Sequence, residues 1–67
     1  MPKITLKAAR VNAGLSQEEV AERLHVSRST LRSWESGNTD PKISQFMMLC
    51  QLYGVSCDNI FFENKIS

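Results

Sequence analysis

The stretch QEEVAERLHVSRSTLRSWES, residues 17–36, contains two short helical patterns with almost no chain between them. The first helix is predicted over Ser16–Leu24, because S-Q-E-E is the spacing of a capping box, in which a serine hydroxyl and a glutamate carboxylate satisfy backbone donors at a helix start. The second is predicted over Arg28–Ser36, with Ser27 as its capping residue. A connection this short forces the two helices to cross at a steep, fixed angle. A helix-turn-helix is therefore the element around which the rest of the chain must pack.

The second of these helices separates its side chains by polarity when they are placed at 100° intervals around its axis. Thr30, Leu31 and Trp34 fall on one side, so we expect Trp34 to anchor the core rather than to act as a stacking platform. The opposite side carries hydrogen-bonding residues: Arg28, Ser29, Arg32 and Ser33. The helix thus has an apolar side to bury and a row of donors to expose.

Two further helices are predicted, one on either side of this stretch. The first, Thr5–Ala13, begins at a capping threonine. The second, Ile43–Gly54, has an apolar repeat at i, i+3, i+4 and i+7 that predicts its buried stripe: Ile43, Phe46, Met47 and Cys50. We expect this helix to form the centre of the core.

The remaining chain is predicted to form one short helix and a tail. Ser56 can cap a fifth helix that carries Ile60 and Phe61, and residues 63–67 are expected to fray. No window alternates with period two over enough residues to predict a strand. The expected fold class is all-α, a compact bundle of five helices.

Length and hydropathy limit the possible classes of protein. The chain has 67 residues, which suits a single domain over residues 1–67 with its core in residues 6–61. Its longest apolar stretch, Phe46–Cys50, is too short to cross a membrane, and the N-terminus lacks the apolar segment of a secretion signal. We expect a cytoplasmic protein that does not interact with membranes.

Charge is segregated along the chain rather than abundant. The formal net charge is only +1, so composition by itself does not indicate a nucleic-acid partner. Three acids lie close together in the first helix of the pair, at Glu18, Glu19 and Glu22. Arg28 and Arg32 lie four residues apart on the second helix. Any interaction with DNA must therefore depend on where the cations lie.

Enzyme and metal chemistry find little support in the sequence. Cys50 and Cys57 lack the spacing of a metal site and are expected to remain reduced, and His25 is the single histidine. There is no nucleophile beside a base, no catalytic site of paired carboxylates and no phosphate loop. We expect a protein that is not an enzyme and that needs no metal, cofactor or small-molecule ligand.

The polar side of the second helix suits recognition of double-stranded DNA. A recognition helix reads base edges from its N-terminal end, and arginine can bind guanine through two hydrogen bonds. The candidate base-reading residues are Arg28, Ser29, Arg32 and Ser33. The candidate contacts to backbone phosphates are Gln17, Ser27, Asn38, Thr39 and Lys42. The alternative is that both arginines only solvate an exposed surface.

The run from Leu6 to Phe61 resembles the Cro/C1-type helix-turn-helix domain of phage repressors and related bacterial regulators. The resemblance is carried in order by LSQEEVA, VSRSTLRSWE, G-N-x-x-P and LYGVSCDNIF. It implies a five-helix, lambda-repressor-like domain that binds a pseudo-palindromic operator as a homodimer. It also implies that Arg10 and Glu35 form a structural ion pair. Where many members have glycine at the turn, this chain has His25, which tolerates a left-handed conformation.

Two functions remain open at this stage. The first is a sequence-specific transcriptional regulator, expected to be a repressor, although the acids at positions 18, 19 and 22 could contact polymerase in an activator. The second is an antitoxin-like protein-interaction module on the same fold. Its docking patch would be formed by Ile60, Phe61, Phe62 and Ile66. A charge reversal at Arg28 distinguishes the two, because it should abolish DNA binding and leave protein docking intact.

Overall fold

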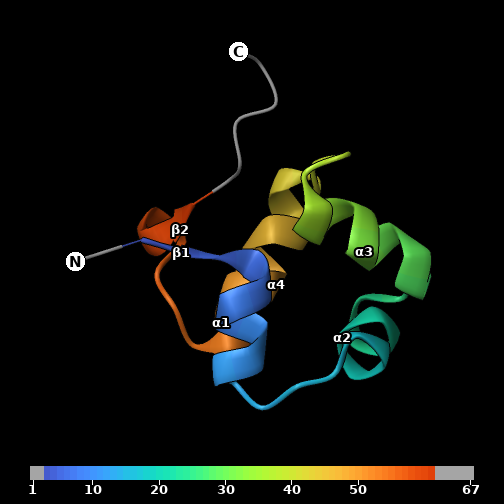
Figure 1. Ribbon diagram of the computed structural model, residues 1–67, viewed down its shortest axis with the longest axis horizontal. Coiled ribbons are helices and arrows are strands. Elements are labelled where there is room, and N and C mark those ends of the chain that lie inside the picture. The colour runs from blue at the N-terminus through green and yellow to red at the C-terminus, as the bar shows by residue number, and fades with distance from the viewer. Residues whose placement is uncertain (1–2, 62–67) are drawn as a thin grey trace.

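The computed structural model describes residues 3–61, and the predicted tail at 63–67 lies outside them. The chain is mostly helical (Figure 1). Its elements in order are β1 Ile4–Thr5, α1 Leu6–Asn12, α2 Gln17–Leu24, α3 Arg28–Ser36, α4 Ile43–Tyr53, a 3-10 turn Cys57–Asn59 and β2 Ile60–Phe61. The four longer helices were predicted from the sequence to within one residue at each end.

Local side-chain caps explain where the first three helices begin. The Ser16 hydroxyl accepts from the Glu19 backbone N–H at 3.1 Å, and the Glu19 carboxylate accepts from the Ser16 N–H at 2.9 Å. This confirms the predicted capping box. Thr5 accepts from the Ala8 N–H at 3.0 Å, and Ser27 caps α3 in the same way.

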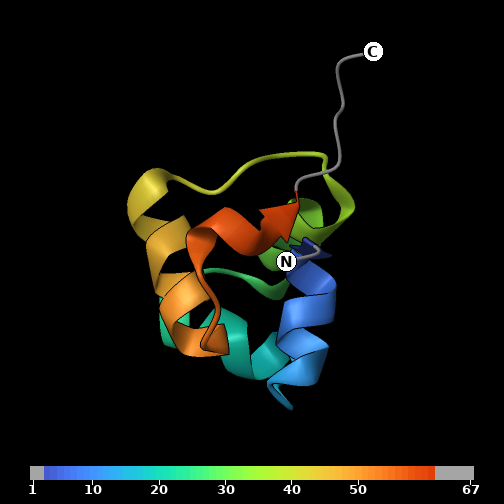
Figure 2. The same cartoon turned by 90° about the vertical axis from the view of Figure 1, so that its left-hand side faces the viewer.

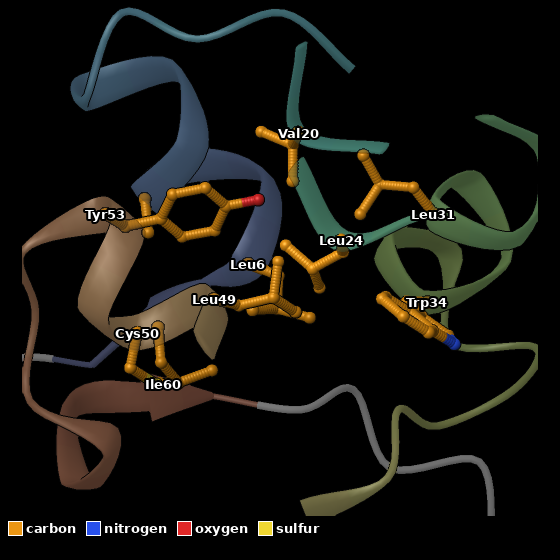
Figure 3. Close-up of a cluster of buried hydrophobic side chains, with 10 residues drawn as sticks. Leu6, Val20, Leu24, Leu31, Trp34, Leu49, Cys50, Tyr53 and Ile60 are labelled. Atoms are coloured by element: carbon orange, nitrogen blue, oxygen red, sulfur yellow. The ribbon is translucent and has the colours of Figure 1, made fainter. Parts of the chain in front are cut away.

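The core forms where the helices converge (Figure 3). Leu31, Leu49 and Val20 are fully buried, and Trp34 is 5% exposed. Leu31 and Trp34 lie on the side of α3 that faces Leu24 of α2, as Figure 3 shows. Burial of a large aromatic side chain is among the strongest contributions to the stability of a small domain. Packing of the buried side of α3 in the core therefore fixes the orientation of its exposed side.

The prediction of a fifth helix is wrong. The Ser56 hydroxyl does accept from the Asp58 N–H at 3.3 Å, but only the three-residue 3-10 turn follows. Ile60 then pairs in parallel with Ile4 in a two-stranded sheet, which also corrects the expectation of no strand. Figures 1 and 2 both show β1 and β2 side by side. Backbone pairing between the two ends of the described residues, with Ile60 buried, outweighs the local helical signal.

The predicted buried stripe of α4 is also partly wrong. Ile43 is 77% exposed and Met47 is 58% exposed, whereas Leu49, Cys50 and Tyr53 are buried. The buried side of α4 is therefore rotated relative to the prediction, because its contacts with α1, α2 and the 3-10 turn determine which residues are covered. No helix within residues 3–61 is long and apolar enough to cross a membrane.

Candidate nucleic-acid interface

The turn between α2 and α3 fixes how the two helices cross. His25 has φ 58° and ψ 42°, the left-handed conformation expected at this position. The Val26 N–H donates to the Ala21 carbonyl at 3.0 Å, and the His25 N–H donates to the Glu22 carbonyl at 3.2 Å. Both bonds satisfy carbonyls that the end of α2 would otherwise leave unpaired. α2 packs mainly against α3, so the pair forms one unit.

The exposed side of α3 carries the predicted base-reading residues together. Arg28, Ser29 and Arg32 are exposed and Ser33 is half-buried, whereas Leu31 is fully buried on the opposite side. A shallow hollow runs along this surface. It is lined by Ser29, Arg32, Ser33, Ser36 and Asn38. Every lining side chain carries a hydrogen-bond donor, although the Ser36 hydroxyl already donates to the Ser33 carbonyl at 3.2 Å. The other four side chains can bind a polar partner.

Arg28 lies at the boundary between this polar surface and an acidic one. It borders a second hollow together with Glu18, Glu19 and Glu22, which are exposed on α2. The capping contacts with Ser16 lower the pKa of the Glu19 carboxyl below its usual value, so it remains charged at neutral pH. A polyanion is repelled by this acidic surface and is attracted to the arginines of α3.

Most of the predicted phosphate-contacting residues lie at the ends of α3. Ser27 is at its N-terminus, where its hydroxyl is already engaged in capping. Asn38, Thr39 and Lys42 are exposed in the segment that follows the C-terminus. The Asn38 N–H donates to the Ser33 carbonyl at 3.0 Å, which holds this segment against the helix. The exposed side of α3 is thus flanked by polar groups at both ends.

Gln17 is placed differently from the other candidates. It is half-buried at the first position of α2, and its side-chain nitrogen donates to Oε1 of Glu35 at 3.0 Å. The two residues are separated by 18 positions in the sequence. No local signal predicts this contact, and sequence analysis missed it.

An ion pair between α1 and α3 lies behind Gln17. The Arg10 Nε donates to Oε2 of Glu35 at 2.7 Å, and its Nη2 donates to Oε1 at 3.3 Å. Arg10 also donates from Nη1 to the Leu15 carbonyl at 2.9 Å. The two side chains are 10% and 5% exposed. Buried charges of this kind are tolerated when both partners are hydrogen-bonded, as they are here.

Tyr53 of α4 adds a buried hydroxyl near the same ion pair. This hydroxyl makes no hydrogen bond with any described residue. Burial, and then the negative charge of Glu35, raise the pKa of Tyr53 well above its usual value. The tyrosine therefore stays neutral and adds no charge beside the ion pair.

The cysteines are free thiols in the core region. Cys50 is buried and Cys57 is half-buried. Burial, with the neighbouring Cys57 thiol, raises the pKa of Cys50 to about 12, so this thiol is protonated at neutral pH. Among residues 3–61 there is no group of three or more histidine, cysteine or acidic side chains that could bind a metal ion.

Comparison with known proteins agrees with this geometry. Residues 6–60 match the model of a family described as helix-turn-helix. The HTH-type transcriptional regulator ImmR of Bacillus subtilis is 36% identical over 62 residues, which are 92% of this chain and 49% of ImmR. The HTH-type transcriptional activator BcrR of Enterococcus faecalis is 33% identical over 91% of this chain and 30% of BcrR. The cryptic phage CTXphi transcriptional repressor RstR of Vibrio cholerae is 36% identical over 90% of this chain and 54% of RstR.

The chain thus spans about half the length, or less, of these three relatives. No solved structure matches it significantly. The aligned part includes both helices of the pair and the segment after α3. The part of the chain that matches these relatives therefore contains the candidate DNA-binding helix pair.

Proposed function

Because the chain belongs to the Cro/C1-type helix-turn-helix family of DNA-binding transcriptional regulators, we propose that it is a repressor that occupies a pseudo-palindromic operator as a homodimer. The observation that carries the proposal is the exposed polar side of α3, whose opposite side is held in the core by Leu31 and Trp34. A rigid helix with donors on its outer side fits the major groove of B-DNA. Occupying an operator is sufficient for repression and requires neither a cofactor nor a small-molecule ligand. The protein acts where its DNA is, in the cytoplasm.

Base reading is assigned to the N-terminal part of α3. Arg28 makes two hydrogen bonds to O6 and N7 of a guanine, because its guanidinium is exposed at the first position of the helix. Ser29 and Ser33 contribute weaker discrimination, since a hydroxyl can bond with several bases. Arg32, one turn further along, contacts a base or a phosphate.

The phosphate contacts lie on either side of this helix. The N-terminus of α2 carries the positive end of the helix dipole, which favours an anion beside Gln17. Ser27, which is exposed just before α3, contacts one phosphate of the DNA backbone. The exposed residues beyond the end of α3 contact others: Asn38, Thr39 and Lys42. These contacts set the register of the protein on the duplex and are independent of sequence.

The dimer is assigned to the exposed side of α4. This helix has no charged residue between Ile43 and Tyr53, and Ile43, Met47 and Met48 are 77%, 58% and 48% exposed. Two copies can bring these uncharged surfaces together without like-charge repulsion and without burying an unpaired charge. A second copy is also what a two-fold operator requires, because two half-sites about 34 Å apart multiply the specificity of a single recognition helix.

A charge placed in this surface tests the dimer. Met47→Lys should prevent self-association in sedimentation velocity and on a two-half-site duplex. Val11→Lys is the matched control, because Val11 on α1 is 57% exposed and receives the same charge. Dimers that survive Met47→Lys, or that Val11→Lys disrupts equally, would exclude this surface. A wild-type protein that remains monomeric both free and on the duplex would exclude the dimer altogether.

Selection of duplexes from a random-sequence pool at two salt concentrations tests the whole proposal. Enrichment of a pseudo-palindrome that contains a guanine, with loss of that guanine from the site selected by Arg28→Ala, is the expected result. Binding that is salt-sensitive but enriches no sequence, or no binding, would contradict it.

The second function to be distinguished is the antitoxin-like protein-interaction module. Of its predicted docking residues, Ile60 is 6% exposed and is not available at the surface, while the side chain of Phe61 and residues 62 and 66 lie outside the described part of the chain. Arg28→Glu should abolish operator binding if the protein is a DNA-binding regulator. If the Arg28→Glu protein no longer binds the operator but still has the same effect in cells as the wild type, protein docking would instead be favoured as the function.

A further inference from the structure

We propose that Glu35 is a positioning residue for DNA binding, which holds the side-chain amide of Gln17 so that one of its N–H groups is presented to a backbone phosphate. This inference rests on the proposed operator binding. It assigns a role to a residue whose side chain is 5% exposed and need not touch DNA itself. The juxtaposition that carries it is the 3.0 Å contact between Gln17 Nε2 and Glu35 Oε1.

The chemistry of the two groups fixes the orientation of the amide. A carboxylate can only accept hydrogen bonds, so the nitrogen of the amide must face Glu35 and the carbonyl oxygen must face away. The nitrogen has two hydrogens, and the contact with Glu35 uses one of them. The second N–H is left for a partner outside the ion pair, and Gln17 is only half-buried, so an external acceptor can reach it.

The carboxylate of Glu35 is itself held firmly. Arg10 binds both of its oxygens, at 2.7 Å and 3.3 Å, in the forked geometry that gives arginine–carboxylate pairs their directional strength. Because Arg10 and Glu35 are 10% and 5% exposed, water competes little for these bonds. The acceptor offered to Gln17 therefore has a single position relative to α3.

The same ion pair also holds the chain immediately before α2. Arg10 donates to the Leu15 carbonyl at 2.9 Å, two residues before Gln17. The start of α2 is thus connected to the ion pair on both sides, through Leu15 to Arg10 and through Gln17 to Glu35. Glu35 belongs to α3, which carries the proposed base-reading residues. The network therefore fixes the spacing between the proposed phosphate contact and the proposed base contacts.

Positioning of this kind strengthens binding by ordering a group before the partner arrives. A glutamine side chain that is already fixed on folding loses no further rotamer freedom when it binds a phosphate. If Glu35 no longer held the amide, Gln17 would have to be ordered at the moment of binding. The contribution of Gln17 to affinity should then depend on Glu35.

Side-chain amide relaxation in the free wild-type protein is the first test. The Gln17 side-chain NH2 group should show a higher 15N order parameter than that of Gln51, which is exposed on α4. Equal disorder of the two amides would overturn the inference. This measurement uses the unmodified protein, so it does not depend on any variant folding.

A double-mutant cycle on the selected operator is the second test. Gln17→Ala should weaken binding about 3- to 10-fold in the wild-type background, the range for one hydrogen bond. In the Glu35→Leu background, where position 35 has no acceptor for the amide, the same change should weaken binding less than about 2-fold. The comparison is made within each background, so the charge lost at position 35 cancels. Each variant is measured at a temperature where circular dichroism shows it to be folded.

Tyr53→Phe is the matched control for a change beside the ion pair. It removes a hydroxyl that makes no hydrogen bond with a described residue, and it should leave the effect of Gln17→Ala unchanged. An effect of Gln17→Ala that is the same in the wild-type and Glu35→Leu backgrounds would overturn this inference while operator binding stood. Failure of the wild-type protein to bind any sequence specifically would overturn the proposed function as well.

Discussion

The backbone N–H of Val26 donates to the carbonyl of Ala21 at 3.0 Å, and this bond closes the turn between the two helices of the DNA-binding motif. It forms because His25, between them, is left-handed at φ 58°. A residue with a Cβ atom is strained in that conformation, whereas glycine is not. The crossing of α2 and α3 thus depends on a residue held in an unfavourable backbone conformation by its surroundings.

His25→Gly should therefore stabilise the protein by about 1 kcal/mol, because it relieves the strain without removing a buried side chain. Chemical denaturation measures the free energy of unfolding. Gly54→Ala is the reciprocal variant. Gly54 has φ 69°, and an added Cβ would meet nothing within 4 Å, so its expected loss of about 1 kcal/mol reflects conformation alone. A His25→Gly protein less stable than the wild type would contradict the strain argument.

Trp34→Ala should destabilise the domain by about 3–5 kcal/mol, since it removes a large side chain that is 5% exposed and joins α3 to the core. A chain of this size has little stability to spare, so we expect a largely unfolded circular dichroism spectrum at 37 °C. Val11→Ala, on the exposed side of α1, should change stability by less than about 0.5 kcal/mol. A folded Trp34→Ala protein with normal stability would show that α3 is anchored by other residues.

Arg28→Ala should weaken binding to the selected operator by about 1–3 kcal/mol and relax the preference at one base pair. Lys42→Ala should instead weaken binding to all sequences about equally and lower the slope of affinity against salt. Arg23→Ala, which removes an exposed arginine from the last turn of α2, controls for the loss of one positive charge. Equal losses on operator and random DNA for Arg28→Ala would refute base reading by this residue.

The thiols should differ in reactivity. At pH 8, iodoacetamide should modify half-buried Cys57 well before buried Cys50, whose pKa is raised to about 12. The same shift predicts a loss of stability in alkali. The unfolded chain ionises this thiol near its usual pKa of 9.0 and the folded protein does not, so the free energy of unfolding falls as pH rises from about 9 toward 12.

Mass spectrometry of alkylated peptides and denaturation at several pH values check the two parts. Cys50→Ala should flatten the alkaline decline relative to the wild type. Equal rates of modification at both cysteines would show that Cys50 is more accessible than the structure indicates.

The sequence by itself determined the features that depend on neighbouring residues. Ser16 and Glu19 are three positions apart, so the capping box and the start of α2 follow from local chemistry. The division of α3 into a buried side with Leu31 and Trp34 and an exposed side with Arg28 follows from the helical repeat. For the same reason, the helical repeat predicts the candidate DNA-contacting side of α3 without any tertiary contact.

Only the tertiary structure decided the features that join distant parts of the chain. Ile60 belongs to a strand and not to the predicted fifth helix, because it pairs with Ile4 at the other end of the described chain. Which side of α4 is buried depends on the helices packed against it. Gln17 faces Glu35 because α2 and α3 cross at an angle that the turn at His25 imposes. Contacts of this kind stabilise the protein only when the whole chain is folded, so no local pattern in the sequence predicts them.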